Sequence, residues 1–235
     1  MIGTLRESSL HAALKQWYAH PDDGLEVAVD GYVVDIRRGD LLIEIQTHNF
    51  SALKRKLPRL LEGHAVRLVH PIALKKWIVR VEADHDTRIS RRQSPRQGWL
   101  EHLFLELVSI PELVAHPNFS LEVLLIHEDE IRCPGISGRR ARWRPRVWRT
   151  CNRRLLDVVE RVVLATPADF RTFLPAGLPQ PFTSRELAGA LDQPDYLAQK
   201  ITYCLRKMGA IQPAGKRGNT LLYVDDASKG HNERP

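Results

Sequence analysis

The sequence predicts an α+β fold that contains a mixed β-sheet. Three observations within the first 84 residues lead to this class: an amphipathic helical pattern at the start, three strand-like segments after it, and a second helical pattern followed by two more strand-like segments. Short turns join antiparallel strands, whereas a helical connection allows a parallel pair in the same sheet. The sheet is therefore expected to be mixed, and residues 1–84 are expected to form the first domain.

The first element is a helix predicted over residues 4–19. Thr4 and Glu7 have the spacing of a capping box at its start. The apolar side chains recur at helical spacing and form one stripe. This stripe consists of Leu10, Ala13, Leu14, Trp17 and Tyr18.

Three strands are predicted next, and the second and third form a β-hairpin. Gly39 and Asp40 separate two runs of β-branched and apolar residues, and such a pair is typical of a two-residue hairpin turn. The predicted strands cover residues 25–29, 31–38 and 41–47.

This hairpin is expected to set three polar side chains on one face. Asp35 lies across from Glu44, with Cβ atoms about 5 Å apart, and Gln46 points the same way because side chains alternate along a strand. Two such carboxylates repel each other, and Mg²⁺, which prefers oxygen ligands, relieves the repulsion. The triplet therefore indicates a metal site. The alternative is a solvated face on which Arg37 neutralises the acids, and spacing alone weighs the two equally. The opposite face would hold Val34, Ile36, Ile43 and Ile45.

The remainder of the first domain is predicted as a helix and two strands. Residues 49–64 have a helical pattern, in which Pro58 kinks or ends the helix. Residues 65–72 and 75–83 are both strand-like. A second region, an Arg-rich α/β segment over residues 85–166, is expected to follow.

The second region begins with a predicted linker. Residues 85–97 are polar, basic and unpatterned, which is typical of a linker or a surface arm and indicates a domain boundary. Helices are then predicted over residues 98–110 and 153–165, and a strand over residues 120–131.

The strongest charge feature of the chain lies between residues 132 and 154. This segment contains nine arginines, two tryptophans and no acidic residue. Arg binds phosphate and stacks on bases, and Trp offers a stacking surface, so contact with nucleic acid is expected. The alternative is a solvated loop whose tryptophans pack back on the domain. The expected contacts are Arg139, Arg140, Arg142, Trp143, Arg144, Arg146 and Trp148.

Residues 167–225 are similar to a winged helix-turn-helix module. The pattern predicts a capped helix over 182–191, a second helix from Pro194 to Gly209, and a hairpin with a basic tip over 210–224. The core side of the second helix would consist of Leu197, Ile201, Leu205 and Met208. Its outward face would present Gln199, Lys200, Tyr203, Arg206 and Lys207. DNA contact is expected here, and a protein docking or dimerisation surface is the alternative.

Composition supports an anionic partner. The 35 Lys and Arg residues outnumber the 28 Asp and Glu residues, which gives a net charge of +7 and a pI of about 9.5.

No apolar run approaches the ~20 residues that span a bilayer, and no signal-peptide core is present, so a cytoplasmic protein without membrane contact is expected. Cys133, Cys151 and Cys204 are widely spaced and predict neither a zinc site nor a disulfide. Residues 226–235 are predicted to be disordered.

The hairpin and the elements around it resemble the PD-(D/E)XK nuclease superfamily. In that family one strand carries an acidic residue. The next strand carries a second acidic residue, followed by any one residue and then a Lys. Asp35, Glu44 and Gln46 match this motif as an E-x-Q variant, and the order of helices and strands matches the restriction-endonuclease-like αβββαβ core. No Pro precedes Asp35, and Gln46 stands where Lys is usual. Lys54 and Lys56 on the following helix are candidate substitutes for that Lys.

The resemblance implies a DNA endonuclease that uses Mg²⁺ or Mn²⁺ and acts in DNA repair, recombination or defence. Asp35, Glu44 and the Ile45 carbonyl would hold the metal, and Gln46 would position the attacking water. Glu7 corresponds to an acid that related resolvases carry on the first helix. Cleavage of both strands would favour a homodimer. Expected DNA contacts outside the Arg-rich segment are Arg37, Arg38, Lys54, Lys200, Tyr203, Arg206, Lys207, Lys216 and Arg217.

Two alternatives to an active nuclease stay open at the level of sequence. In the first, a catalytically inactive nuclease-like core only binds DNA and the chain is a regulator. In the second, the chain is an interaction subunit of a larger repair or defence assembly.

Overall fold

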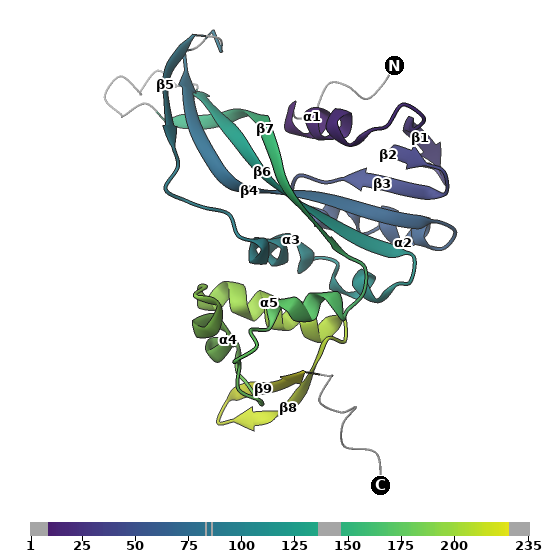
Figure 1. Cartoon of the computed structure of the whole chain (residues 1–235), viewed down its shortest axis with the longest axis vertical. Helices are drawn as coiled ribbons and strands as arrows, with labels where there is room; N and C mark the ends of the chain where they lie inside the picture. The colour runs from purple at the N-terminus through teal and green to yellow at the C-terminus, as the bar shows by residue number, and fades with distance from the viewer. Residues whose placement is uncertain (1–8, 83, 86, 136–146, 226–235) are drawn as a thin grey trace.

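The protein has an α+β fold with one large mixed sheet. The computed structural model describes residues 9–82, 84–85, 87–135 and 147–225. Within them, one sheet has seven strands and a second has two. Helix α1 covers one face of the large sheet, whereas α2, α3 and the C-terminal helices lie on the other (Figure 1).

The large sheet combines antiparallel and parallel pairs. Its spatial order is β1 (Gly24–Val29), β2 (Tyr32–Arg38), β3 (Leu41–Ile45), β4 (Ala65–Val81), β6 (Phe119–Pro134) and β7 (Trp148–Leu164), and β5 (Arg88–Gln93) pairs with β4. The β3–β4 and β4–β6 pairs are parallel, and the other pairs are antiparallel. The mixed sheet that the sequence predicted is therefore confirmed.

The helical elements are mostly short. The longer ones are α1 (Ser9–Tyr18), α4 (Ser184–Leu191) and α5 (Asp195–Lys207), and the shorter ones are α2 (Lys56–Leu61), α3 (Phe104–Leu107) and the 3-10 helices η1 (Phe50–Leu53), η2 (Leu100–Leu103), η3 (Pro111–Ala115) and η5 (Asp169–Phe173). The predicted helix over 49–64 is thus split into η1 and α2. Pro58 lies in the first turn of α2. Backbone N–H groups in a first turn have no partner within the helix, so the missing N–H of proline costs no hydrogen bond there.

The predicted hairpin register is confirmed. Arg38 lies opposite Leu41 and Ile36 lies opposite Ile43, so the turn is centred on Gly39 and Asp40. Gly39 has a φ of 57°, a left-handed conformation that a residue without a Cβ adopts easily.

The prediction of two separate strands over 65–72 and 75–83 is wrong, because β4 is one strand of 17 residues. Pro71 lies in its interior and lacks an N–H. On that edge of β4, pairing with β3 ends at Val69, and pairing with β5 begins only at Trp77. The strand continues past Pro71 because β6 pairs with its other edge throughout.

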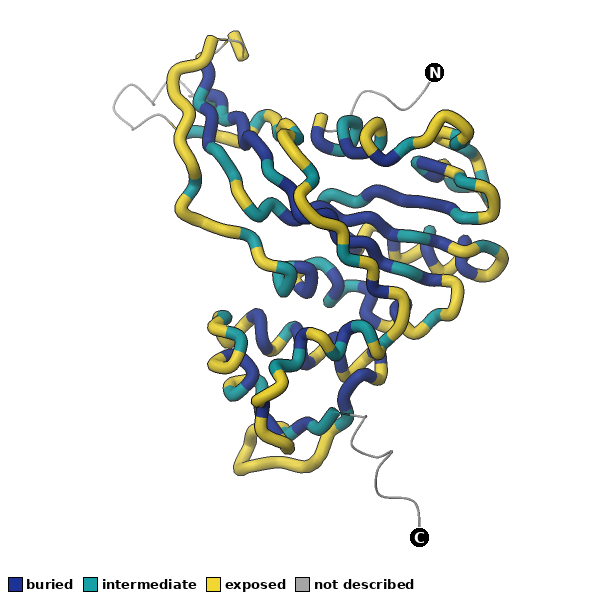
Figure 2. The backbone as a smooth tube through the Cα atoms, in the orientation of Figure 1, coloured by how far each residue is buried: buried dark blue, intermediate teal, exposed yellow. Residues whose placement is uncertain are grey.

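The segment expected to be a linker is partly a strand. Arg88–Gln93 forms β5, and all six of its residues are exposed, as Figure 2 shows for this edge of the sheet. Strands β6 and β7 then join the sheet that β1 to β4 begin, so the boundary expected near residue 84 does not separate two sheets. The polar composition of these residues gives no strand pattern in the sequence. They form a strand all the same, because the backbone pairing of β5 with β4 does not depend on buried side chains.

The helix predicted over 153–165 is wrong, since residues 153–164 belong to β7. Apolar residues recur there at helical spacing because the strand contains β-bulges. Leu156 and Val159 each lack an opposing residue on β6. The pairs Glu128–Leu155 and His127–Asp157 leave Leu156 unpaired, and the pairs Ile126–Val158 and Leu125–Glu160 leave Val159 unpaired. Each extra residue shifts the alternation by one and produces an apolar doublet that imitates a helix.

The expected helix, helix and hairpin order of the C-terminal region is observed. Thr183 caps α4 in a capping box with Glu186, and Pro194 precedes α5. The hairpin consists of β8 (Ile211–Arg217) and β9 (Thr220–Asp225). The predicted core side of α5 is confirmed, because these residues are at most 3% exposed: Leu197, Ile201, Leu205 and Met208. The expected disorder of residues 226–235 lies outside the described residues.

The prediction of no disulfide is wrong. A disulfide joins Cys133 of β6 to Cys151 of β7, and their Cα atoms are 6.0 Å apart. Eighteen residues separate them in sequence, so only the pairing of β6 with β7 brings them together.

One aromatic cluster joins the sheet to the C-terminal region. Phe104 of α3 is fully buried, and its ring centroid lies 4.7 Å from that of Phe173 and 6.3 Å from that of Phe170, both in η5. Helix α3 also packs against α5. The cluster therefore holds α3 and η5 together, although these two segments are distant in sequence.

We expect Phe104→Ala to lower the free energy of unfolding by about 3–5 kcal/mol, because it leaves a cavity in this cluster. The neighbouring Leu105 is 39% exposed, so Leu105→Ala is the matched control and should cost less than about 1 kcal/mol. Urea unfolding followed by circular dichroism measures both. Equal losses would show that the cluster does not stabilise the junction.

Candidate active site

The two predicted acids lie where β2 and β3 separate. Backbone pairing between these strands ends at Ile36 and Ile43. One residue further along, Asp35 inserts its carboxylate between the strands, and its Oδ2 accepts a hydrogen bond of 2.8 Å from the Ile45 N–H. The side chain thus replaces the backbone ladder and fixes the distance between the strands.

The expected division of the hairpin into a polar and an apolar face is only partly correct. Ile36, Ile43 and Ile45 pack beneath α1, whereas Val34 packs in the cluster on the α2 side. Opposite Asp35, Glu26 of β1 has a φ of 52°, which interrupts the regular strand. Alternation therefore breaks at Asp35.

Asp35 is partly buried and keeps its charge. His11 of α1 places Nε2 3.2 Å from Asp35 Oδ2. Burial raises the pKa of Asp35, but the hydrogen bond and charge of His11, the Ile45 amide and the charge of Lys56 outweigh it, so the pKa lies below its usual value. Asp35 is an ionised carboxylate at neutral pH.

Glu44 is more deeply buried than Asp35. Its Oε1 forms an ion pair of 2.5 Å with Lys56 Nζ, and Lys56 also donates to the Val33 carbonyl at 2.6 Å. Among the described residues, no hydrogen-bond partner reaches Glu44 Oε2, which is buried. Burial and the negative charge of Asp35 raise the pKa of Glu44 to about 7, although Lys56 opposes the shift.

Gln46 is anchored to the loop that follows β3. Its Nε2 donates to the carbonyls of His48 at 2.6 Å and Asn49 at 3.3 Å. His70 Nδ1 donates to the Gln46 carbonyl at 2.7 Å, and burial lowers the pKa of His70 to about 4, so this ring is neutral at pH 7. The hydrogen bonds of Gln46 hold the end of β3 in place.

Two residues of the acid cluster were not predicted in the positions where the structure places them. Lys56 appeared only as a substitute for the missing motif Lys, and the structure brings it to Glu44. His11 was not singled out, although it follows Leu10 of the predicted apolar stripe and therefore borders the face that α1 turns to the sheet. Glu7 lies outside the described residues.

The expected nucleic-acid contacts near the hairpin differ in their surroundings. Arg37 and Lys54 are exposed. Arg38 donates two hydrogen bonds to Asp23, at 2.9 and 2.7 Å, and a third to the Tyr18 carbonyl at 2.9 Å, so it ties the hairpin to the end of α1.

In the Arg-rich segment, Trp148 is the one expected contact that the described residues include. Its ring packs under the guanidinium of Arg80, 4.9 Å from the centroid, which agrees with the alternative that this tryptophan packs back on the domain. The remaining expected contacts lie outside the described residues: Arg139, Arg140, Arg142, Trp143, Arg144 and Arg146.

The expected basic face of the C-terminal region is partly paired with acids. Lys207 lies 3.0 Å from Glu112 of η3, and Arg217 lies 2.8 Å from Glu186 of α4. Arg206 and Lys207 both lie over the Tyr203 ring. Lys200 is half-buried and Lys216 is exposed.

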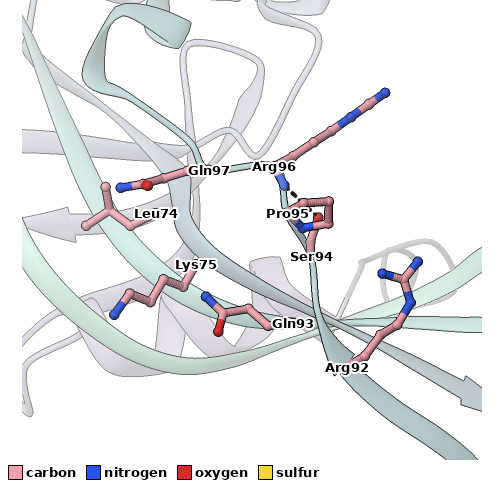
Figure 3. Close-up of a pocket in the computed structure, with 8 residues that line it drawn as sticks. All are labelled: Leu74, Lys75, Arg92, Gln93, Ser94, Pro95, Arg96 and Gln97. Atoms are coloured by element: carbon pink, nitrogen blue, oxygen red, sulfur yellow. Dashed lines mark hydrogen bonds between the residues drawn. The ribbon is translucent and has the colours of Figure 1, made fainter.

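A second basic surface was not predicted, because residues 85–97 were expected only to be a linker or a surface arm. Lys75, Arg92 and Arg96 line a hollow of about 490 Å³ between β4 and the end of β5 (Figure 3). All three residues are exposed. The basic composition of the segment was the available signal, but only the β4–β5 pairing places Lys75 beside the two arginines.

Sequence comparison gives the relatives of this chain. Residues 8–165 match a family described as a domain of unknown function, DUF8091, and this match covers more than half of the chain. The chain belongs to the DUF8091 family. An uncharacterized protein of Treponema pallidum (strain Nichols) is 30% identical over 235 residues, which is 100% of this chain and 91% of that relative. No solved structure matches the chain significantly.

The DUF8091 region contains the whole large sheet and the acid cluster. It ends one residue after β7, and α4, α5 and the small sheet lie outside it. In the described part of the chain, no helix has the length and apolar character needed to cross a membrane.

We expect the stability of the metal-free protein to depend on Glu44 between pH 4.5 and 7. Because the folded-state pKa is raised to about 7, protonated Glu44 stabilises the fold below pH 4.5, and this contribution is lost as the pH rises through 7. Glu44→Gln has no proton to lose. Relative to the wild type, the variant should gain on the order of 3 kcal/mol over this range, since the pKa is raised from 4.5 to about 7 and one pKa unit corresponds to about 1.4 kcal/mol.

Urea unfolding at several pH values in the presence of EDTA measures this difference. A constant difference between the two proteins across the pH range would contradict the raised pKa of Glu44.

Proposed function

We propose that this chain is a metal-dependent DNA endonuclease with a PD-(D/E)XK-like active site, in which Lys56 takes the role of the motif Lys. One observation carries the proposal: a buried Glu44 and an ionised Asp35 lie together where β2 and β3 separate, with the Lys56 ammonium 2.5 Å from Glu44. Burying two carboxylates is costly for stability, and perturbed acids of this kind are more frequent at functional sites.

The residues of the cluster fit a hard divalent cation. Carboxylate oxygens are the ligands that Mg²⁺ and Mn²⁺ prefer, and Glu44 Oε2 is a buried acceptor that has no hydrogen-bond partner among the described residues. Asp35, Glu44 and the Ile45 carbonyl would hold the cation. When bound, it would acidify a water molecule and stabilise negative charge on the phosphate.

The other residues of the cluster would position the reacting groups. His11 orients the Asp35 carboxylate at 3.2 Å and helps to keep it ionised. Lys56 supplies a positive charge that would bind a phosphate oxygen or the attacking water. The hydrogen bond from His70 to the Gln46 carbonyl holds β3, and therefore the backbone that carries Glu44.

Lys56→Met should lower metal-dependent cleavage of labelled DNA by at least about 100-fold, an effect typical of removing one charge-stabilising group from an active site. Asp35→Asn and Glu44→Gln should abolish cleavage. The assay compares single-stranded, duplex, flap and four-way-junction DNA with Mg²⁺, Mn²⁺ or EDTA.

Arg55→Met is the matched control, since Arg55 is exposed and directly precedes Lys56, and it should keep cleavage near the wild-type rate. Gln46→Lys would place a Lys at the motif position and should partly restore cleavage to Lys56→Met. Cleavage that persists in Asp35→Asn would overturn the proposal.

A nuclease-like core that binds DNA without cutting it is the second candidate. It is favoured by the Lys56–Glu44 ion pair, which offsets the charge of Glu44 without a cation. Under this candidate the wild type and all site variants bind DNA equally, and none of them cuts any substrate with any metal.

The basic hollow between β4 and β5 should contribute to DNA binding in either case. Arg92→Gln and Arg96→Gln each remove one charge from it, so each should weaken duplex binding and lower the slope of log affinity against log salt by about 1. Fluorescence anisotropy over a salt series measures both quantities. Arg59→Gln removes the same charge from a surface pair with Glu62 on α2 and serves as the control. An unchanged slope in both β5 variants would exclude the hollow as a phosphate contact.

A further inference from the structure

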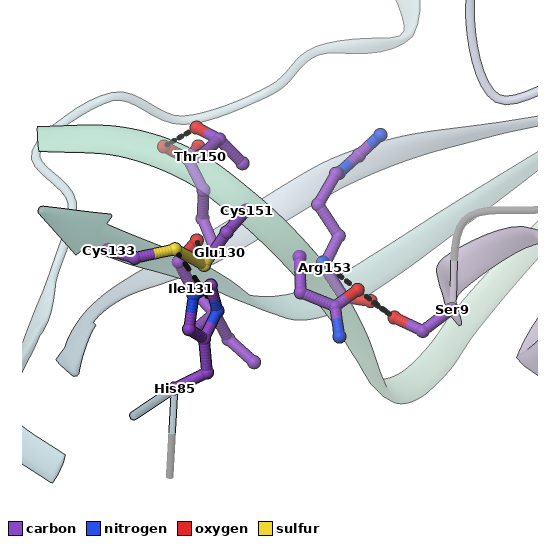
Figure 4. Close-up of a disulfide and its surroundings, with 9 residues drawn as sticks. Ser9, His85, Glu130, Ile131, Cys133, Thr150, Cys151 and Arg153 are labelled. Carbon is purple, nitrogen blue, oxygen red and sulfur yellow. Dashed lines mark hydrogen bonds between the residues drawn. A yellow bond between two sulfur atoms is a disulfide. The ribbon is translucent and has the colours of Figure 1, made fainter. Parts of the chain in front are cut away.

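Three residues with metal-binding side chains lie close together in the part of the large sheet where β4, β6 and β7 extend past the end of β3. They are His85, in the turn between β4 and β5, Cys133 of β6 and Cys151 of β7 (Figure 4). Their ligand atoms all lie within 4.8 Å of one another, and His85 Nδ1 is 3.6 Å from Cys133 Sγ. The two sulfurs are joined as a disulfide.

A β-bulge brings Cys151 to this place. Ile131 of β6 lies opposite Asn152, and Arg132 lies opposite Thr150, so Cys151 is an extra residue without a partner on β6. An extra residue turns its side chain out of the regular alternation. The bulge directs the Cys151 sulfur to Cys133.

His85 reaches the two sulfurs from a third segment of the chain. It is exposed and has a φ of 69°, a left-handed conformation that is uncommon for residues other than glycine. Ligands from three separate segments therefore converge at one point of the surface.

We propose that, after reduction of the disulfide, Cys133, Cys151 and His85 bind Zn²⁺ or a similar borderline-soft divalent cation. Two thiolates and one imidazole are a common zinc donor set, and a water molecule completes the tetrahedron. Ligand atoms around tetrahedral zinc lie roughly 3.3–3.8 Å apart for bonds of about 2.0–2.3 Å. His85 Nδ1, 3.6 Å from Cys133 Sγ, already has this spacing, and the two sulfurs move apart to it once reduction breaks the bond between them.

The disulfide and the metal site are alternative states of the same two sulfurs. A dithiol reductant supplies two electrons and two protons, becomes a disulfide itself, and leaves Cys133 and Cys151 as free thiols. Zn²⁺ then binds the two thiolates and releases two protons. Reoxidation by a disulfide oxidant forms the S–S bond again, transfers two electrons to that oxidant, which becomes a dithiol, and expels the cation.

The surroundings of His85 favour this chemistry. A hollow of about 290 Å³ adjoins it and offers room for the fourth ligand, and Arg88, Arg154 and Asp129 line the same hollow. Both states join the strands on either side of residues 136–146, which carry five of the basic side chains expected to bind nucleic acid.

Cobalt titration tests the site directly, because Co²⁺ substitutes for Zn²⁺ and shows a sulfur-to-metal charge-transfer absorption only when thiolates bind it. The full-length protein is reduced with a phosphine, reduction is checked by alkylation and mass spectrometry, and Co²⁺ is added before competition with Zn²⁺. The reduced wild type should bind one Co²⁺ per chain with this absorption, and the oxidised protein should show none.

Variants assign the ligands. Cys133→Ser and Cys151→Ser should lose the charge-transfer absorption, and His85→Ala should keep part of it while binding Co²⁺ at least about 10-fold more weakly. Cys204 is buried in α5, away from this cluster, so Cys204→Ala controls for loss of a thiol and should bind like the wild type. His85 is exposed, so its variant tests the site even if a cysteine variant fails to fold.

Three results would overturn the proposal: a disulfide that resists reduction in the folded protein, a reduced wild type without the absorption, or an absorption that His85→Ala leaves at full affinity. None of these bears on DNA cleavage, since the experiment uses no DNA and leaves Asp35 and Glu44 unchanged.

Discussion

The parallel pairing of β4 with β6 is the constraint on which the rest of the structure depends. These two strands pair from Val66 to Arg80 and run along the full length of the sheet. At one end β4 pairs with β3, which carries the acid cluster, and at the other it pairs with β5, which carries exposed arginines. The candidate active site and the basic hollow are therefore fixed relative to each other through one continuous strand.

The buried acids of the large sheet differ in how their oxygens are bonded. Glu122 of β6 is fully buried, and both of its oxygens are bonded: Tyr18 donates to one at 2.6 Å and Arg161 to the other at 2.6 Å. This network clamps α1 to the sheet. Glu44 has Lys56 at one oxygen, whereas the other has no hydrogen-bond partner among the described residues. A buried acceptor in this state costs free energy, which a bound cation would recover. Glu128 resembles Glu44 in having one oxygen without a hydrogen-bond partner among the described residues, but that oxygen lies 3.6 Å from Lys76 Nζ.

The β-bulges in β7 have a structural and a chemical consequence. An irregular edge strand resists pairing with a further chain, and β7 is a long strand at the edge of the large sheet. Two of the bulges expose Leu156 and Val159, and a third directs Cys151 to Cys133. The same backbone irregularity thus shapes the edge and creates the cysteine pair.

Local patterns in the sequence determined the hairpin, the α+β class and the C-terminal helices, because turn residues, caps and apolar spacing act between residues that are close along the chain. The Gly39–Asp40 turn and the capped helix over 182–191 are found where they were predicted, and the cap residue is Thr183. Only the tertiary structure decided the length of β4, the strand identity of β7 and the Cys133–Cys151 pair, because each depends on pairing with β6, which lies far away in sequence. The acid pair was visible in the hairpin, and Lys56 was one of two candidate lysines, but the packing that places His11 and Lys56 beside the acids was not visible. His11 and Lys56 reach Asp35 and Glu44 from two helices, and a hairpin pattern contains no information on how those helices pack.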